Sequence, residues 1–261
     1  LVQDGVLTRT VAETARLLDV LAGMEVGDAT WAPPPAAPFA AAVERDPARL
    51  RVGVAVNPPL PDAEVDPIAL AAVRDAAELL AELGHEVEEI EPSWANPALL
   101  GLFSTAFMTA IATSIGWTAL LAGREPRRED MQAMSWAIWE QARRWTAVDH
   151  AAATAQLQGT MRALLVELDP WDVILTPALA QRPLPIGALD SDDDEDPLAA
   201  FAGGARFTPF TAGANASGQP AIALPLAHGP DGLPVGVQLV GRPAREDVLL
   251  ALGAQIERPR P

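Results

Sequence analysis

Two short apolar runs near the end of the chain, separated by a turn-rich segment, give its clearest hydrophobic pattern. The runs are Ala221–Leu226 and Pro234–Val240, and Gly229-Pro230-Asp231-Gly232 lies between them. Glycine and proline supply the backbone angles of a reversal, so the pattern predicts a β-hairpin. In the second run alternate positions from Val235 to Leu239 are apolar, whereas the intervening positions, such as Gln238, are mixed. This alternation is typical of a strand in a sheet that helices cover.

The first third of the chain combines helical and strand patterns. Thr10, followed three residues later by Glu13, has the spacing of a capping box and predicts a helix that stops at Gly23. A second helix is predicted from Asp66-Pro67 to Gly84, between two β-rich runs. These runs, residues 50–56 and 85–90, would form a parallel pair with the helix as a right-handed crossover.

The remaining segments complete an alternation of helices and strands. The range 97–144 is expected to form two or more helices, and Asp149 is the expected N-cap of a helix to about Leu168. The other expected elements are a buried strand at 172–176, a solvated acidic loop at 190–197, a short helix at 206–217 and a last helix at 245–257. The extended connector 24–38 contains Trp31, which we expect to anchor it on the body. The sum predicts an α/β protein whose mixed β-sheet is covered by helices on both faces.

Composition and charge narrow the classes of function. The formal net charge is −17, which argues against nucleic acid and anionic membranes as partners because both require clustered positive charge. The chain contains no cysteine, which excludes disulfides and thiolate chemistry and is compatible with the cytoplasm. All basic residues are arginine, so a lysine general base or Schiff base is excluded for this chain as well.

The chain contains neither a recognisable signal peptide nor a clear membrane span. It opens with Leu1-Val2-Gln3-Asp4, without a basic start and without an initiator methionine, and we expect it to begin partway through a longer protein. The segment 97–123 comes nearest to a span, but serine and threonine interrupt it, so a buried or partly buried helix is expected.

Two kinds of catalytic or metal site are disfavoured by spacing. The three histidines, His85, His150 and His228, are expected at ordinary surface positions, and no G-x-S-x-G elbow is present. A calcium loop counted from Asp190 would need glycine at its sixth position and a carboxylate at its twelfth, where the chain has Glu195 and Phe201. We therefore expect no metal site and no histidine-based triad.

Aromatic residues are unevenly distributed. The chain has seven tryptophans and no tyrosine, and four of the tryptophans lie within 117–145. Helical spacing of this kind is more often core packing, but pockets for apolar ligands are lined in the same way. The substrate-contact candidates are Phe103, Phe107, Trp136, Phe207, Phe210 and Asn215.

The segment Phe207–Gly241 as a whole resembles the C-terminal signature of the amidase signature family. The resemblance is carried by Gly218-Gln219-Pro220-Ala221, by Gly232-Leu233-Pro234-Val235-Gly236-Val237-Gln238, by Asp172–Pro177 and, near the start, by Gly5-Val6-Leu7-Thr8-Arg9-Thr10-Val11. It covers essentially the whole chain. The connector with Pro33-Pro34-Pro35 is most similar to bacterial amidases of the nylon-oligomer and aryl-amide hydrolase type.

The resemblance implies hydrolysis of amide C–N bonds without a cofactor. Family members use a serine nucleophile, activated through a second serine by a neutral lysine, and a Gly/Ser-rich loop that holds the oxyanion. This chain has no lysine, no Ser-Ser pair and no such loop. No catalytic residue is therefore assigned here, and residues 1–261 are interpreted as the C-terminal part of one amidase domain.

Two hypotheses remain for the function. In the first, the chain supplies scaffold and one wall of the substrate cleft to an active amidase, and the variable wall comes from residues 97–148. Its partners would then be a small amide substrate and the missing N-terminal half. In the second, the chain is a catalytically silent module that binds a ligand or a partner protein. The substrate's identity and the oligomeric state, including a homodimer, stay open.

Overall fold

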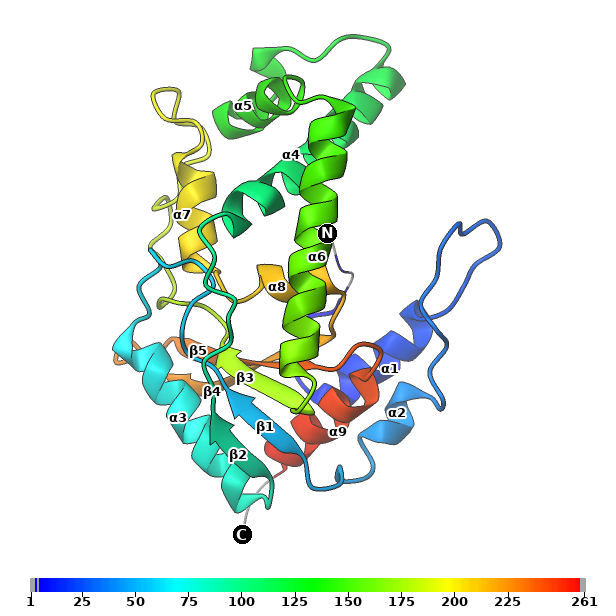
Figure 1. The fold of residues 1–261 in the computed structure, drawn as a ribbon, viewed down its shortest axis with the longest axis vertical. Coiled ribbons are helices and arrows are strands. Elements are labelled where there is room, and N and C mark those ends of the chain that lie inside the picture. Colours follow the sequence, from blue (N-terminus) through cyan, green and yellow to red (C-terminus); the bar gives the residue numbers. More distant parts are fainter. Residues whose placement is uncertain (1–2, 4, 259–261) are drawn as a thin grey trace.

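A five-stranded mixed sheet forms the base of the molecule (Figure 1). The computed structural model describes residue 3 and residues 5–258; Leu1, Val2 and Asp4 of the opening segment lie outside this description. The strands are β1 (Arg51–Val54), β2 (Glu86–Glu89), β3 (Val173–Pro177), β4 (Ala221–His228) and β5 (Pro234–Gly241). Their order is β2-β1-β3-β5-β4, in which β1 is parallel to β2 and β3, and β5 is antiparallel to β3 and β4.

The described helices cover the sheet and extend beyond it. They are α1 (Val11–Leu21), α2 (Phe39–Ala42), α3 (Pro67–Glu82), α4 (Leu99–Ala122), the 3₁₀ turn η1 (Arg128–Asp130), α5 (Ala133–Ala142), α6 (Ala147–Leu168), α7 (Ala199–Phe207), α8 (Ala212–Ser217) and α9 (Glu246–Glu257). Figure 1 shows α4, α5, α7 and much of α6 rising away from the sheet, whereas α1, α2, α3 and α9 lie close to it.

Alternation along the strands divides the core between two faces. Val52 and Leu175 join the cluster packed by α1, α2, α3 and α9, whereas Ala55 and Ile174 join the cluster packed by α6 and the start of α4. Side chains of a strand point alternately to opposite faces, so β3 contributes Val173 and Leu175 to the first cluster and Ile174 to the second. The predicted class, an α/β protein with a mixed sheet covered by helices on both faces, is confirmed.

The predicted βαβ unit is confirmed in its main features. The Asp66 carboxylate caps α3 by accepting a hydrogen bond from the Ile68 amide at 2.8 Å, and Pro67 follows in the first helical position. Gly84 closes the helix with φ +94°, a conformation that glycine adopts without the steric cost of a Cβ. The predicted hairpin is also present as β4 and β5, with a bulge between Leu224 and Ala227.

Two predicted helix boundaries are wrong. Helix α6 begins earlier than expected, because Thr146 is its N-cap and Asp149 is the third helical residue of a reciprocal capping box. The expected short helix at 206–217 is two helices, α7 and α8, interrupted at residues 208–211. Pro209 lies in this interruption, and proline lacks the amide hydrogen that a continuous helix requires there.

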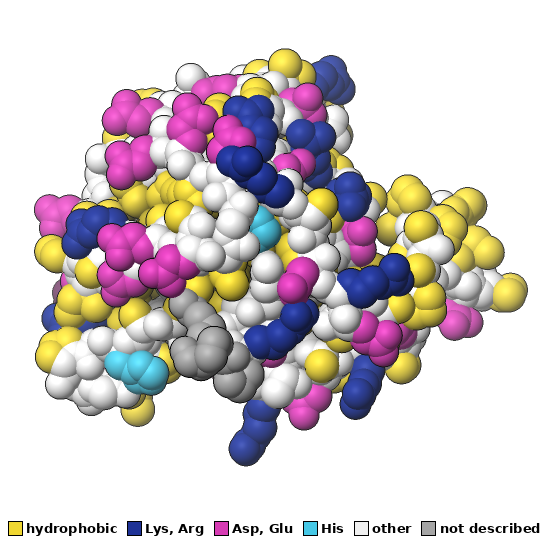
Figure 2. Space-filling model, turned by 90° about the horizontal axis from the view of Figure 1, so that it is seen from below, with side chains coloured by type: hydrophobic (Ala, Val, Ile, Leu, Met, Phe, Trp, Pro, Cys, Tyr) yellow, Lys and Arg dark blue, Asp and Glu magenta, His cyan; other side chains and the backbone are white. Residues whose placement is uncertain are grey.

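The connector between α1 and α2 projects from the body. Trp31 was expected to anchor it, but this side chain is 60% exposed, so that expectation is wrong. Met24 and Val26 are exposed as well. Figure 2 shows the resulting projection, at the right, covered largely by hydrophobic side chains, while acidic and basic side chains are scattered over the rest of that face.

Helix α4 is the helix that was expected within residues 97–123, and its serine and threonine residues interrupt only the apolar character of the segment. Its serine and threonine hydroxyls donate to carbonyl groups one turn earlier, as Thr109 Oγ1 does to the Thr105 carbonyl at 2.6 Å, and so do not break the helix. By length and composition alone, its 24 residues with a mean hydropathy of 1.6 would suffice to cross a membrane, and 22% of the most apolar window is buried. A helix covered by other polypeptide has the same composition.

Candidate substrate site

Two of the six predicted substrate contacts form an aromatic cluster on α4. The rings of Phe103 and Phe107 are stacked, with centroids 5.4 Å apart and an interplanar angle of 20°. Phe201 of α7 completes the cluster, with its ring centroid 6.2 Å from that of Phe107. Phe207, the predicted contact, lies at the end of the same helix, whereas Phe201, six residues earlier, makes the contact with Phe107.

Phe210 and Asn215 lie in a separate group nearer the sheet. Phe210 is buried and meets the Trp94 ring edge-on, with centroids 6.5 Å apart and an interplanar angle of 69°. The Asn215 side-chain amide donates within α8 to the Thr211 carbonyl at 3.4 Å. Trp136 is half-buried on α5, and Phe207 ends α7. The six residues therefore do not form one cluster, and their contact with substrate stays a prediction.

The group around Phe210 lies at the carboxyl ends of parallel strands. After β1 the chain crosses through α3 to β2 on one side, and after α4–α6 it returns to β3 on the other side of β1. In open α/β sheets, ligands bind at such a switch point, outside the carboxyl ends of the strands. Asn57 follows β1 here, and its backbone carbonyl accepts a hydrogen bond from Trp94 Nε1 at 2.8 Å. Neither Asn57 nor Trp94 was among the predicted contacts, because their meeting depends on the pairing of β1 with β2 and not on a local pattern.

A buried amide fixes the chain segment that carries Phe210. Gln238 of β5 donates from Nε2 to the Thr176 hydroxyl and to the Phe210 carbonyl, both at 3.1 Å. Gln238 and Thr176 are almost completely buried, and buried polar groups are normally hydrogen-bonded in this way. Gln238 thus couples the neighbouring strands β3 and β5 to the loop between α7 and α8.

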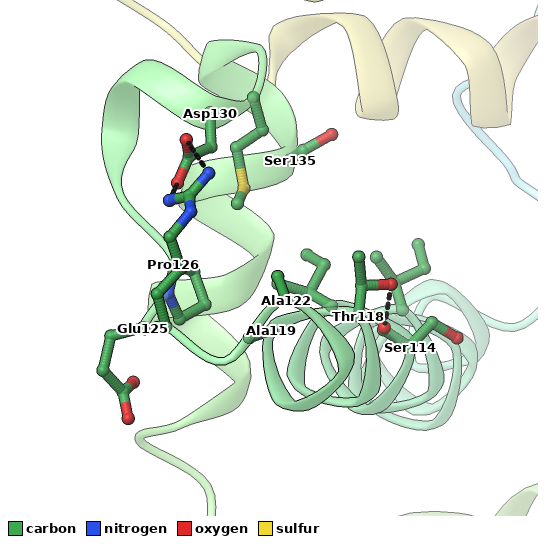
Figure 3. Close-up of a pocket in the computed structure, with 12 residues that line it drawn as sticks. Ser114, Thr118, Ala119, Ala122, Glu125, Pro126, Asp130 and Ser135 are labelled. Atoms are coloured by element: carbon green, nitrogen blue, oxygen red, sulfur yellow. Dashed lines mark hydrogen bonds and ion pairs between the residues drawn. The ribbon is translucent and has the colours of Figure 1, made fainter.

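A cavity of about 500 Å³ lies between α4 and the turn that leads into α5 (Figure 3). Its α4 wall consists of Ile111, Ser114, Ile115, Thr118, Ala119 and Ala122. Met131 and Ser135 line it from the opposite side. The hydroxyls of Ser114 and Thr118 are engaged within α4, donating to the carbonyls of residues 110 and 114. None of the six predicted contacts lines this cavity.

The charges at the rim of this cavity neutralise one another. Arg124 donates to both carboxylate oxygens of Asp130, at 2.5 and 2.7 Å (Figure 3). This hydrogen-bonded pair lowers the pKa of the Asp130 carboxyl and raises the pKa of the Arg124 guanidinium. The Glu125 carboxylate points away from the cavity in the same view. Apart from Glu125, whose carboxylate points away, the cavity therefore offers a ligand apolar walls and one closed ion pair.

His85 and the acidic loop make contacts within the fold. His85 is buried, contrary to the surface position expected for it: Nδ1 accepts from the Leu50 amide at 3.2 Å, and Nε2 lies 2.9 Å from Gln255 Oε1. The acidic loop is exposed, as predicted, and Arg128 binds Asp192 and Asp194 in it. Among residues 3 and 5–258, no three histidine, aspartate or glutamate side chains are grouped to hold a metal ion.

Comparison with known families agrees with this architecture. The family model described as Amidase matches residues 1–250. The chain belongs to the amidase family. It is 36% identical, over 97% of its length, to the 6-aminohexanoate-cyclic-dimer hydrolase of Paenarthrobacter ureafaciens, and 30% identical, over 98% of its length, to an acylamidase of Rhodococcus erythropolis.

Solved structures extend this similarity to three dimensions. A structure of 6-aminohexanoate cyclic dimer hydrolase complexed with substrate matches 95% of the chain with a TM-score of 0.88 and 36% identity. A bacterial aryl acylamidase of the amidase signature family shares the fold, with a TM-score of 0.79 at 20% identity. The chain spans about half of these proteins, 53% of each 6-aminohexanoate-cyclic-dimer hydrolase and 52% of the acylamidase. The hypothesis of a catalytically silent module receives no support from these relatives.

Proposed function

We propose that the chain is the scaffold part of a hydrolase that cleaves the C–N bond of an amide, with aliphatic cyclic amides as the first substrate class and aryl amides as the second. The observation that carries this proposal is the 36% identity to a cyclic-dimer amide hydrolase across nearly the whole chain. The acylamidase relative supports the second class.

In this proposal the chain binds and orients substrate but holds no reacting group. Amide hydrolysis by a serine enzyme requires a base that removes the hydroxyl proton and fixed donors that stabilise the oxyanion. The family's lysine and paired serines are absent from the sequence, and the Nδ1 atom of His85 already accepts a backbone hydrogen bond. The aromatic cluster of Phe103, Phe107 and Phe201 would shield one side of the scissile amide from water.

The reacting groups would then lie on the other half of a longer amidase polypeptide. That half would cover apolar surface left open in the present chain, which includes the exposed side chains Trp117, Leu120 and Leu121 on α4. The same partner would extend the sheet from the edge strand β4, whose outer side has no strand partner among the described residues.

Turnover by a polypeptide that contains this chain together with an amidase N-terminal half tests the proposal. Release of primary amine from 6-aminohexanoate cyclic dimer and of 4-nitroaniline from 4-nitroacetanilide would be measured in parallel. We expect hydrolysis of at least one, with kcat/KM higher for the cyclic dimer. Absence of both activities in a folded protein would contradict the proposed function, and hydrolysis of the anilide alone would reverse the order of the substrate classes.

A further inference from the structure

The cavity between α4 and α5 shares a helix face with the aromatic cluster. Phe107, Ile111, Ile115 and Thr118 follow one another at intervals of four, four and three residues, and such residues lie on one side of a helix. At a rise of about 1.5 Å per residue, the path from Phe107 to Thr118 is about 16 Å long. One apolar track thus leads from the predicted wall of the cleft into the cavity.

The lining of the cavity indicates the chemistry of its ligand. At the rim, Arg124 and Asp130 form a bidentate ion pair, so neither charge is left for a ligand. The hydroxyls of Ser114 and Thr118 already donate to their own helix. A carboxylate entering here would lose water without meeting a free cation, and an ammonium group would find only Glu125, whose carboxylate points away from the cavity. Methylene groups, in contrast, would gain contact with isoleucine, alanine and methionine side chains.

The geometry points to a distal subsite, and we propose that the α4–α5 cavity binds an uncharged, flexible aliphatic segment of an amide ligand. Its volume of about 500 Å³ falls within the usual range for small-molecule sites, roughly 300–1,000 Å³. The identity of the ligand as an amide rests on the proposed function. Binding of an aliphatic chain by the cavity does not require turnover, so it is measured separately.

Calorimetric titration of the purified chain with N-hexylacetamide tests the subsite. We expect saturable binding to the wild type. Thr118→Trp, which places a large ring in the cavity, is expected to raise Kd about tenfold, the equivalent of expelling about two buried methylene groups. Leu120→Trp is the matched control, because residue 120 is 68% exposed and lies on the opposite side of α4. Its Kd should equal that of the wild type.

Ala122→Trp provides a second cavity-filling variant if Thr118→Trp does not fold, with circular dichroism reporting helix content in each case. Zwitterionic 6-aminohexanoate should not bind, because its carboxylate would lose water without meeting a free cation in the cavity lining, where Arg124 is already paired with Asp130. No saturable binding of N-hexylacetamide to the folded wild type would overturn the proposal. Equal Kd values for the wild type and both filling variants, or equal weakening by Leu120→Trp, would overturn it as well. Turnover in the longer polypeptide that is insensitive to Thr118→Trp would leave the amidase function standing and remove the subsite.

Discussion

Gln238 is the residue on which the position of the Phe210 loop depends most directly. It lies on β5, and its side-chain amide donates hydrogen bonds to the Thr176 hydroxyl of β3 and to the Phe210 carbonyl in the loop between α7 and α8. A buried acceptor that loses its donor costs more than the hydrogen bond itself contributes, because it is not rehydrated. A single amide therefore links the sheet to the predicted cleft mouth.

Gln238→Leu is expected to lower the free energy of unfolding by about 1–3 kcal/mol, because the buried Phe210 carbonyl and Thr176 hydroxyl lose a donor. Urea unfolding followed by circular dichroism measures the change. Gln158→Leu, at an exposed position of α6, is the control and should change stability by less than about 0.5 kcal/mol. An unchanged midpoint for Gln238→Leu would show that this network does not stabilise the fold.

Asp66, at the start of α3, is expected to make a pH-dependent contribution to the free energy of unfolding. The Ile68 amide, and after it the Arg182 guanidinium at 3.1 Å, lower the pKa of its carboxyl below the ordinary 3.8. Because the pKa of this carboxyl is lower in the folded than in the unfolded state, folding favours the carboxylate form. Its stabilisation of the fold is therefore complete above the ordinary pKa and is lost as the pH falls through the lowered value.

Asp66→Ala should therefore cost about 1 kcal/mol at neutral pH, the usual cost of losing an N-cap, and less at pH 3. Urea unfolding of the variant and the wild type at both pH values gives the comparison. Asp75→Ala, at an exposed position later in α3, removes the same charge without removing a cap. A deficit in Asp66→Ala that is equal at both pH values would contradict the assigned role of the carboxylate.

At the scale of elements, residue patterns within each segment predict most helices and strands. The features that they do not predict depend on contacts between distant segments. Strand alternation and the signals at Thr10, Asp66 and Gly84 are local, and the elements that they predict are present. The start of α6 is also encoded locally, since Thr146 and Asp149 have capping-box spacing, in which Thr146 is the N-cap and Asp149 the third helical residue. Pro209 likewise marked the break between α7 and α8.

The candidate site was less predictable because it depends on how elements meet. The helical spacing of Phe103 and Phe107 was visible, but the arrival of Phe201 follows from the placement of α7 over α4. The α4–α5 cavity depends on the turn that the Arg124–Asp130 pair closes. His85 is buried where it meets Leu50, just before β1, and Gln255 of α9, which no periodicity of its own segment indicates.

Gly53 tests how closely β1 is packed. A Cβ at this position would lie 2.6 Å from Ile90 Cδ1 and 3.1 Å from the Trp171 ring. Gly53→Ala is therefore expected to lower the free energy of unfolding by about 1–3 kcal/mol through overpacking. At Gly159 of α6 nothing lies within 4 Å of such a Cβ, so Gly159→Ala should stabilise the helix by about 0.5–1 kcal/mol. Thermal unfolding distinguishes them, and a stabilising Gly53→Ala would refute the close packing.

At the scale of the whole molecule, the chain combines a well-packed sheet with apolar surface that nothing in the described residues covers. Trp117, Leu120 and Leu121 at the end of α4 are each more than half exposed, and surfaces of this kind mediate association. This exposure agrees with a chain that spans about half of its relatives.

The isolated chain is therefore expected to associate as its concentration rises, despite its net charge of −17. Light scattering across a concentration series measures this. The triple variant Trp117→Gln, Leu120→Gln and Leu121→Gln should shift the molecule toward monomer, whereas an equal number of substitutions at exposed alanines of α6 should not. A monodisperse wild-type monomer of 27.4 kDa at all concentrations would contradict the expectation.

The central claim is that this chain shapes an amidase cleft and carries none of the groups that react. Amine release from 6-aminohexanoate cyclic dimer by the purified, folded chain alone measures it most directly. The account predicts no release above the uncatalysed background. Steady turnover that scales with the concentration of the chain, and that is absent from an identically purified blank, would contradict it.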